Sequence, residues 1–332
     1  MLMLDWLAEK ILAKLSGENL VVAGLLLATA LGSALYAYFK TVENRSFREF
    51  FEFLLPPDIL FHRSAKADFL FWITRRAILP FLMFPAGAAF VAAVGYATNR
   101  LVGGAFGITE PLLGAPGPFT IVIFTFTMLL AYDISYYIYH WAQHKFPFLW
   151  ELHKVHHSAE VMVGITKDRV HPLDALMNSI WDGVIPGICF GLWTLVSLDP
   201  VEVTVFGINV YVMRNILMMD FVRHTHLKIS FGPLNNVVLC PHWHQLHHSA
   251  DPKHYDKNFG LLFSFWDRWF GTLCVPEKDE TFKFGLMERE SHEYQSLFGL
   301  YVLPLTRMWG HIARLFRPRA ETARPPGESA PS

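Results

Sequence analysis

Residues 118–144 read PFTIVIFTFTMLLAYDISYYIYHWAQH, an apolar run that ends in two histidines four residues apart. A helix needs roughly 20 apolar residues to cross a bilayer, and this stretch is long enough. Residues four apart share one face of a helix. The stretch therefore predicts a membrane-spanning helix that presents His140 and His144 side by side at one membrane surface.

Four further segments have the length and composition of a membrane span, at about 19–39, 76–97, 174–197 and 201–222. The last two are joined by the short turn Leu198-Asp199-Pro200, so they are expected to form a helical hairpin. The whole chain is 52% hydrophobic and only 17% charged, which is typical of burial against lipid. The predicted fold class is an all-α integral membrane protein with about five transmembrane helices and a helical cap.

The distribution of basic residues predicts how these helices are oriented. Lysines and arginines are frequent between about 40 and 76, whereas the loop of about 98–117 carries only Arg100. The positive-inside rule then places the first of these loops in the cytoplasm. His140 and both outer ends of the hairpin, near Asp174 and His224, follow on the same side. We therefore expect a multi-pass protein with its histidines on the cytoplasmic face.

The chain is expected to divide into a membrane region at 1–117, a histidine-bearing catalytic domain at 118–285 and a cytoplasmic segment at 286–332. The first residues are expected to form an interfacial helix rather than a cleaved signal peptide, because charges interrupt the apolar stripe. The tail from Arg317 on is rich in Pro, Ala and Arg and is expected to be disordered. A net charge of −1 gives no reason to expect a nucleic-acid partner.

Three histidine boxes carry the chemistry of this sequence: an HxxxH at 140–144 and two HxxHH motifs at 153–157 and 244–248. Imidazole is a good ligand for Fe, Zn, Cu and Ni. Eight imidazoles are too many for one ion, so the boxes predict two. The predicted metal ligands are His140, His144, His153, His156, His157, His171, His224, His244, His247 and His248.

Residues near the boxes are candidates to support the ligands, because a ligating imidazole usually donates its second N–H to a partner. Asp133 lies two turns before His140 in an otherwise apolar helix. Asp174 and Asp267 lie beside other histidines, and His226 follows His224 by two residues. Each of these aspartates could instead cap a helix or pair with an arginine.

These motifs resemble the fatty acid hydroxylase (sterol desaturase) superfamily of membrane di-iron enzymes. The resemblance runs from Asp133 through the boxes to the Asn258-Phe-Gly260 and Trp266-Asp-Arg-Trp-Phe-Gly-Thr272 motifs. It implies two Fe ions, with Zn possible in purified protein, and O₂ as co-substrate. It also implies hydroxylation or desaturation of a membrane lipid, with electrons from a cytochrome b5-like or ferredoxin-like protein. His226 departs from many relatives, which carry Asn, Asp or Glu there, so the exact ligand set stays open.

Two other classes of protein fit this sequence less well. A membrane metal transporter would need polar residues along a path through its helices, yet here the histidines cluster at one end. A membrane zinc hydrolase would need few ligands and typically an HExxH motif, which this chain lacks. Within the oxygenases, a sterol desaturase or sterol methyl oxidase remains an alternative to a general lipid hydroxylase.

Overall fold

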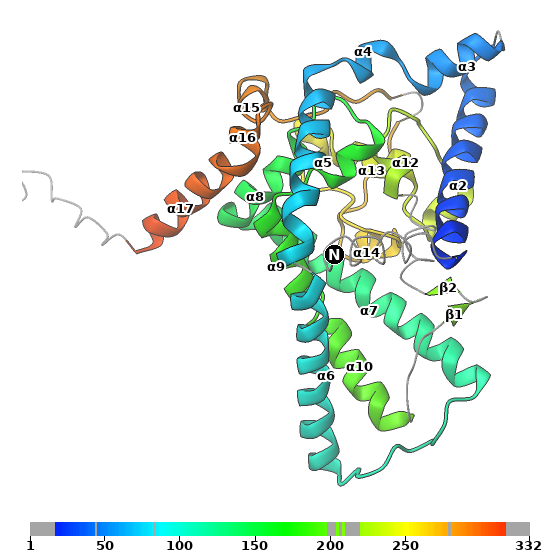
Figure 1. The fold of residues 1–332 in the computed structure, drawn as a ribbon, viewed down its shortest axis with the longest axis vertical. Coiled ribbons are helices and arrows are strands. Elements are labelled where there is room, and N and C mark those ends of the chain that lie inside the picture. The colour runs from blue at the N-terminus through cyan, green and yellow to red at the C-terminus, as the bar shows by residue number, and fades with distance from the viewer. Residues whose placement is uncertain are drawn as a thin grey trace, which may run out of the picture.

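The computed structural model describes residues 17–43, 45–82, 84–197, 204–205, 208–209, 220–277 and 280–316. The expected interfacial helix at the start, the expected disordered tail from Arg317 and the predicted turn at 198–200 lie outside these residues. Within them, the fold is almost entirely helical, as predicted (Figure 1).

The helices follow the order of the chain with short connections. The first half holds α2 (Gly17–Thr41), α3 (Phe47–Leu54), α4 (Pro57–Leu60), α5 (Arg63–Leu82), α6 (Phe84–Phe106), α7 (Pro118–Lys145) and α8 (Pro147–His157). Next come α9 (Pro172–Trp181), α10 (Ile185–Val196), α12 (Asp220–Arg223), α13 (Pro241–His247) and α14 (Phe265–Trp269). The described chain ends with α15 (Glu288–Glu293), α16 (Leu297–Tyr301) and α17 (Leu303–Leu315). Three 3₁₀ turns, η1 (Gly164–Asp168), η2 (Gly232–Asn236) and η3 (Pro252–His254), lie between them.

Two stretches among the described residues are long and apolar enough to cross a membrane, Pro118–Lys145 and Pro172–Val196. Both were predicted from the sequence. The second is interrupted between α9 and α10, where Pro186 lies in the first turn of α10 and lacks the N–H that a continuous helix needs. Figure 1 shows α6, α7 and α10 together in the lower part of the molecule, with α12 and α13 above them.

Glycines allow α6 and α10 to pack closely. A Cβ at Gly191 would lie 2.3 Å from the carbonyl oxygen of Gly95, and a Cβ at Gly187 would lie 2.9 Å from the side-chain Cβ of Val94. Small residues four apart on one helix let two backbones approach, which is a common way for helices to associate in membranes. The pair α6–α10 thus forms a tight unit beneath the cap, which is the upper part of the molecule that contains α12 and α13 (Figure 1).

The other predicted spans differ from the structure. The segment 76–97 straddles the end of α5 and the start of α6. The segment 19–39 is helical in α2, but α2 stands beside α12 in the upper part of Figure 1 rather than next to α6, α7 and α10. Within 201–222, Thr204–Val205 (β1) pairs antiparallel with Ile208–Asn209 (β2), so the predicted continuous helix is wrong at these residues. Thr204, Val205 and Ile208 are β-branched, and such residues favour an extended backbone.

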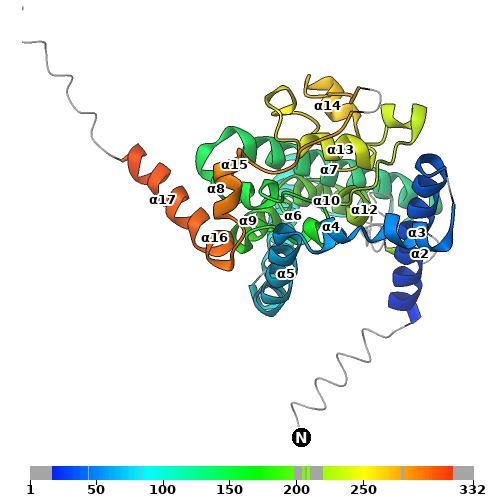
Figure 2. The ribbon, with the colours of Figure 1, turned by 90° about the horizontal axis from the view of Figure 1, so that it is seen from above.

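The cap joins segments from the whole chain. Phe71 of α5, Val155 of α8 and Leu300 of α16 are all fully buried in one cluster. The C-terminal helices therefore pack on the histidine-bearing α8, and α17 extends outward from it, opposite α2 and α3 (Figure 2). This cluster therefore fixes α8 against α5 and α16.

Candidate metal centre

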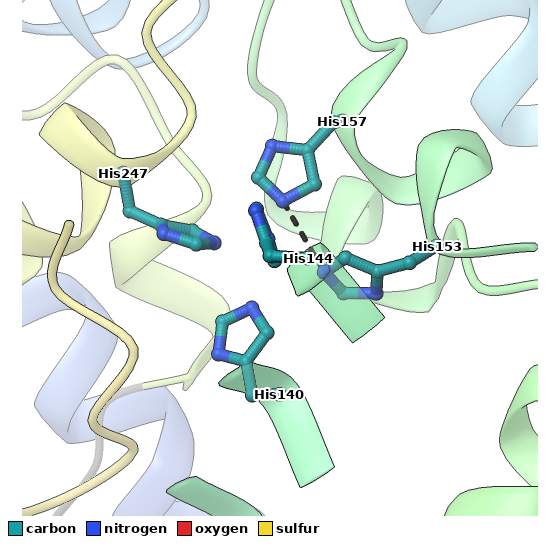
Figure 3. Close-up of side chains that lie close together, drawn as sticks. All are labelled: His140, His144, His153, His157 and His247. Atoms are coloured by element: carbon teal, nitrogen blue, oxygen red, sulfur yellow. Dashed lines mark hydrogen bonds between the residues drawn. The ribbon is translucent and has the colours of Figure 1, made fainter. Parts of the chain in front are cut away.

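Nine of the predicted ligands come together in two buried groups. The first, called the His140 group, consists of His140, His144, His153, His157 and His247. The second, called the His224 group, consists of His156, His224, His244 and His248. Within each group, the nitrogens that could bind a metal all lie within 4.8 Å of one another. Figure 3 shows the five rings of the first group turned toward a common centre.

The two HxxHH boxes are each divided between the groups. On α8, His153 and His157 enter the His140 group while His156 enters the other. On α13 and its C-cap, His244 and His248 share the His224 group while His247 crosses over. Residues four apart thus share a group, because they differ by only about 40° around the helix axis. The third histidine of each HxxHH box lies in the other group.

The groups are adjacent, as a dinuclear centre requires. The ring of His157 in the first group stacks on that of His248 in the second, with centroids 4.6 Å apart and planes 26° apart. The ring centroid of His156 also lies 4.6 Å from that of His248. The sites are therefore linked by ring contacts as well as by shared helices.

The nitrogen positions fit metal binding. The Nε2 atom of His224 lies 3.0 Å from Nε2 of His244 and 3.3 Å from Nε2 of His156. Nitrogens that bind one ion at about 2.0–2.1 Å lie about 3.0–3.4 Å apart. In the other group, the buried Nε2 atoms of His140, His144 and His247 have no hydrogen-bond partner. Leaving several buried ring nitrogens unpaired is costly unless a ligand fills the space between them.

Burial keeps these imidazoles neutral and therefore able to bind a metal. It lowers the pKa of His156, His157 and His244 well below 6.5, and the neighbouring imidazoles lower it further. For His247, burial lowers the pKa to about 3. A neutral imidazole has the lone pair that a metal needs.

Backbone carbonyls orient two ligands of the His140 group. Nδ1 of His140 lies 2.8 Å from the carbonyl oxygen of Phe259, and Nδ1 of His247 lies 2.7 Å from that of Lys257. Each Nδ1–H donates to a carbonyl, so each Nε2 carries its lone pair toward the group. Such contacts fix the tautomer and orientation of ligating histidines.

Carboxylates lie beside two other histidines of the His140 group, His153 and His144. Asp174 accepts hydrogen bonds from Tyr139 and Gln143, and its second oxygen lies 3.5 Å from Nδ1 of His153. Asp256 lies 3.6 Å from Nδ1 of His144. Asp174 was predicted in this supporting role. Asp256 was not, because it follows the last box in a loop whose position depends on the fold.

Asp133 and Asp267 support the site through the backbone. Asp133 accepts hydrogen bonds from the N–H groups of Leu262 and Phe263, and Asp267 accepts from those of Phe259 and Gly260. The Phe259 carbonyl in turn binds His140. Gly260 is needed here, since a Cβ would approach the Asp267 carboxylate to 2.8 Å. Both aspartates thus position a segment that touches a ligand.

Two predicted residues lie elsewhere. His171 caps α9: its Nδ1 accepts from the N–H of Leu173, and its Nε2 lies 3.0 Å from the carbonyl oxygen of Tyr301. With both nitrogens engaged, it belongs to neither group. The Nε2 atom of His226 lies 2.7 Å from the carbonyl oxygen of Phe53 in α3. The structure therefore gives no support for His171 as a ligand or for His226 as a partner of one.

Aromatic side chains that the motifs did not single out enclose the His140 group. The buried ring of Phe259 lies within 5.7 Å of the rings of His140, His144 and His247. Trp150 of α8 lies 4.8 Å from His144. These rings restrict water around the ligands. The only sequence signal was the place of Phe259 between Asn258 and Gly260.

Arg169 holds the end of α8 that carries His156 and His157. Its guanidinium donates to the Val155 carbonyl, to the Ser158 hydroxyl and to the Tyr294 carbonyl. It also pairs with Asp68 of α5 at 2.7 Å, and both side chains are completely buried. One arginine thus connects the ligand-bearing helix with segments on either side of it in the sequence.

Comparison with known proteins agrees with this geometry. Residues 125–272 match the family model described as "Fatty acid hydroxylase". The chain is 29% identical over 159 residues to an alkylglycerol monooxygenase of Caenorhabditis elegans, covering 48% of this chain and 28% of that protein. It is 32% identical over 151 residues to that of Danio rerio, covering 46% and 30%. It is 27% identical over 158 residues to the human cholesterol 25-hydroxylase, covering 44% and 49%.

These matches centre on the histidine-bearing part. The matched segment spans less than a third of the alkylglycerol monooxygenases and about half of the cholesterol 25-hydroxylase. No solved structure matches the chain. The boxes, the two histidine groups and the family match agree, and residues 125–272 match a fatty acid hydroxylase domain.

Proposed function

We propose that this chain is a multi-pass membrane oxygenase that binds two iron ions and hydroxylates, or desaturates, a lipid C–H bond with O₂. The observation that carries the proposal is the pair of adjacent, buried, all-histidine groups at the end of an apolar helix. The names of the relatives, monooxygenase and hydroxylase, point to the same reaction class.

The proposed ligands are the nine histidines of the two groups. When bound, iron would supply the activation of O₂ and the oxidation of the substrate carbon. The chain's own residues hold the ligands: Phe259 and Lys257 through their carbonyls, Asp174 and Asp256 through their carboxylates. Phe259 and Trp150 limit water, which protects a reactive centre from side reactions.

The lipid is expected to reach the centre from the membrane that α7 crosses, with the histidines on the cytoplasmic face. Placement of the carbon, rather than reactivity, would decide which bond is oxidised. Electrons are expected from a separate cytochrome b5-like or ferredoxin-like protein. The catalytic domain is proposed to cover 118–285, with 1–117 as a membrane region and 286–332 as a cytoplasmic segment, of which α16 and α17 pack on α8.

Two substrate classes are favoured by specific relatives. The similarity to alkylglycerol monooxygenases favours a glycerol ether lipid. The similarity to cholesterol 25-hydroxylase favours a sterol as the second candidate. The sequence-based alternatives of sterol desaturase and sterol methyl oxidase belong with this second class.

Metal content tests the centre directly. The purified chain is loaded anaerobically with Fe(II), and the iron bound per chain is counted. We expect two irons in the wild type and fewer in both His247→Ala and His244→Ala, which remove one ligand from each group. His242→Ala is the matched control, because His242 lies on the same helix outside both groups and should leave the count at two.

Turnover tests the reaction. The loaded enzyme receives a reductant, O₂ and a membrane lipid extract that includes alkylglycerols and sterols, and the lipids are followed by mass spectrometry. A gain of one oxygen or a loss of two hydrogens, absent in both alanine variants, would support the proposal and identify the lipid. Two irons with no O₂ consumed on any lipid class would refute an oxygenase while leaving the metal site intact.

A further inference from the structure

Four exposed apolar side chains and the partly buried Phe265 form a patch on and beside α14. The patch consists of Leu234, Val237, Phe265, Trp269 and Phe270. Trp269 is 69% exposed and Phe270 58%, while Leu234 and Val237 are 57% and 47% exposed. Such a concentration of exposed aromatic and aliphatic surface on a small element marks an interaction site.

The patch is rigidly built. The rings of Phe265, Trp266 and Trp269 pack within 5.3 Å of one another. Ser264 donates its hydroxyl to the Asn235 carbonyl, and Arg268 donates to Asn236, so α14 and η2 form one surface. Exposure here is therefore a property of an ordered surface.

The patch docks on α7 at a definite height. The indole N–H of Trp266 donates to Asp133 at 2.9 Å, and Phe270 stacks on Tyr137 with centroids 5.2 Å apart. At about 1.5 Å per residue, the 20 residues from 118 to 137 are about 30 Å long, the thickness of the hydrocarbon core. The patch thus meets α7 where that helix leaves the hydrocarbon, and Figure 1 places α14 at the junction of the lower helices and the cap.

We propose that this patch is a membrane anchor, inserted into the headgroup region of the bilayer beside α7. Trp and other aromatic rings favour this depth, because they are apolar with a polar edge. Arg268 fits it as well, since its apolar stem can lie along the surface while the charge reaches phosphate. A protein partner is a weaker fit, because the exposed part of the patch offers a single charge for recognition.

The anchor is connected to the proposed metal centre. Asp267 lies within α14, and its carboxylate binds the backbone of Phe259, whose carbonyl contacts His140. Asp133 binds the same segment from α7. The element that would touch lipid therefore also sets the position of a ligand, so insertion would seat the histidine groups at a fixed height above the bilayer.

Photo-crosslinking in native membranes tests the anchor on the full chain. The photoreactive residue p-benzoylphenylalanine replaces Trp269, and the adducts are identified by mass spectrometry. Met287 is the matched negative position, because it is 72% exposed and is the N-cap of α15, which lies in the upper part of the molecule, well away from α7, in Figure 1. Phe126, 55% exposed on α7, is the positive position.

We expect phospholipid adducts at 269 and 126 and none at 287. Adducts at 126 without any at 269 would overturn the anchor while leaving the membrane span of α7 standing. A protein adduct at 269 in place of lipid would also overturn it and would identify a partner surface. Lipid adducts at all three positions would overturn it too, because the labelling would then not depend on depth.

Discussion

Replacing Arg169 by leucine should destabilise the whole cap. The guanidinium is completely buried and pairs with Asp68, which is also completely buried. Removing one member of a buried ion pair leaves the other charge uncompensated and costs about 3–5 kcal/mol. The carbonyls of Val155 and Tyr294 would lose their donor as well, at about 1–3 kcal/mol each if water cannot replace it.

Variants of the same pair separate charge from hydrogen bonding. Arg169→Lys keeps the charge beside Asp68 but has no planar fork to reach Ser158 and Tyr294 together, so its cost should be smaller, about 1–3 kcal/mol. The double variant Asp68→Leu/Arg169→Leu removes both charges and should be more stable than Arg169→Leu alone. The order of stability expected is wild type, Arg169→Lys, the double variant and then Arg169→Leu.

Thermal unfolding in detergent measures these differences. A second wavelength or a second probe then confirms that unfolding occurs in one transition. For Arg169→Leu the loss corresponds to a fall in Tm on the order of 10 °C. Iron loading should fall in parallel, because Arg169 holds the end of α8 next to His156 and His157. Arg48→Leu is the control: it breaks an exposed ion pair with Glu52 and should leave Tm unchanged.

Two results would refute this reasoning. A loss below about 1 kcal/mol in Arg169→Leu would mean that the pair is solvated or replaceable. A double variant less stable than Arg169→Leu would mean that the uncompensated Asp68 charge is not the main cost. If Arg169→Leu does not fold but the double variant does, the uncompensated Asp68 charge is again the main cost, and if neither folds, it is not.

Three further changes have definite outcomes. Gly191→Ala should destabilise the α6–α10 contact by about 1–3 kcal/mol, because the new Cβ would clash with the backbone of Gly95. Gly24→Ala should instead stabilise α2 by about 0.5–1 kcal/mol, because its Cβ would point into open space. Thermal unfolding of the two variants measures both effects. Burial raises the pKa of Asp267 from 3.8 to about 6, so the unfolded chain releases this proton first, and this carboxyl should add a downward slope of about 3 kcal/mol to the free energy of unfolding between pH 4 and pH 6, against the upward slope of the buried histidines. Asp267→Asn should lack that slope in pH-dependent unfolding. Asp174→Asn should weaken iron binding about 10–100-fold in a metal titration, because it alters the partner of His153, and unchanged affinity would exclude this role.

The sequence predicted the parts of this protein that depend on local geometry. The span at 118–140 and the pairing of histidines four residues apart follow directly from the helical repeat. The number of groups followed from counting imidazoles. The location of His171 also had a local explanation that was overlooked, since a residue with a side-chain acceptor before a proline is typical of a helix N-cap.

Other features depend on contacts between distant segments and left no local signal. The division of each HxxHH box between two groups is decided by where α8 and α13 lie relative to α7. The carbonyls of Lys257 and Phe259, and the pairing of Asp68 with Arg169, join residues that only the tertiary fold brings together. The helix predicted at 204–205 and 208–209 was wrong because an apolar run with β-branched residues has the hydropathy of a span without its helical propensity.

The sharing of α8 and α13 between the two histidine groups has a thermodynamic consequence. A metal bound to His153 and His157 orders the same helical turn that presents His156, and one bound to His244 and His248 orders the turn that presents His247. Binding of the first ion therefore includes part of the entropic cost of ordering the ligands of both ions. Occupancy should be positively cooperative, with chains holding either no iron or two, and singly loaded chains scarce even when iron is limiting.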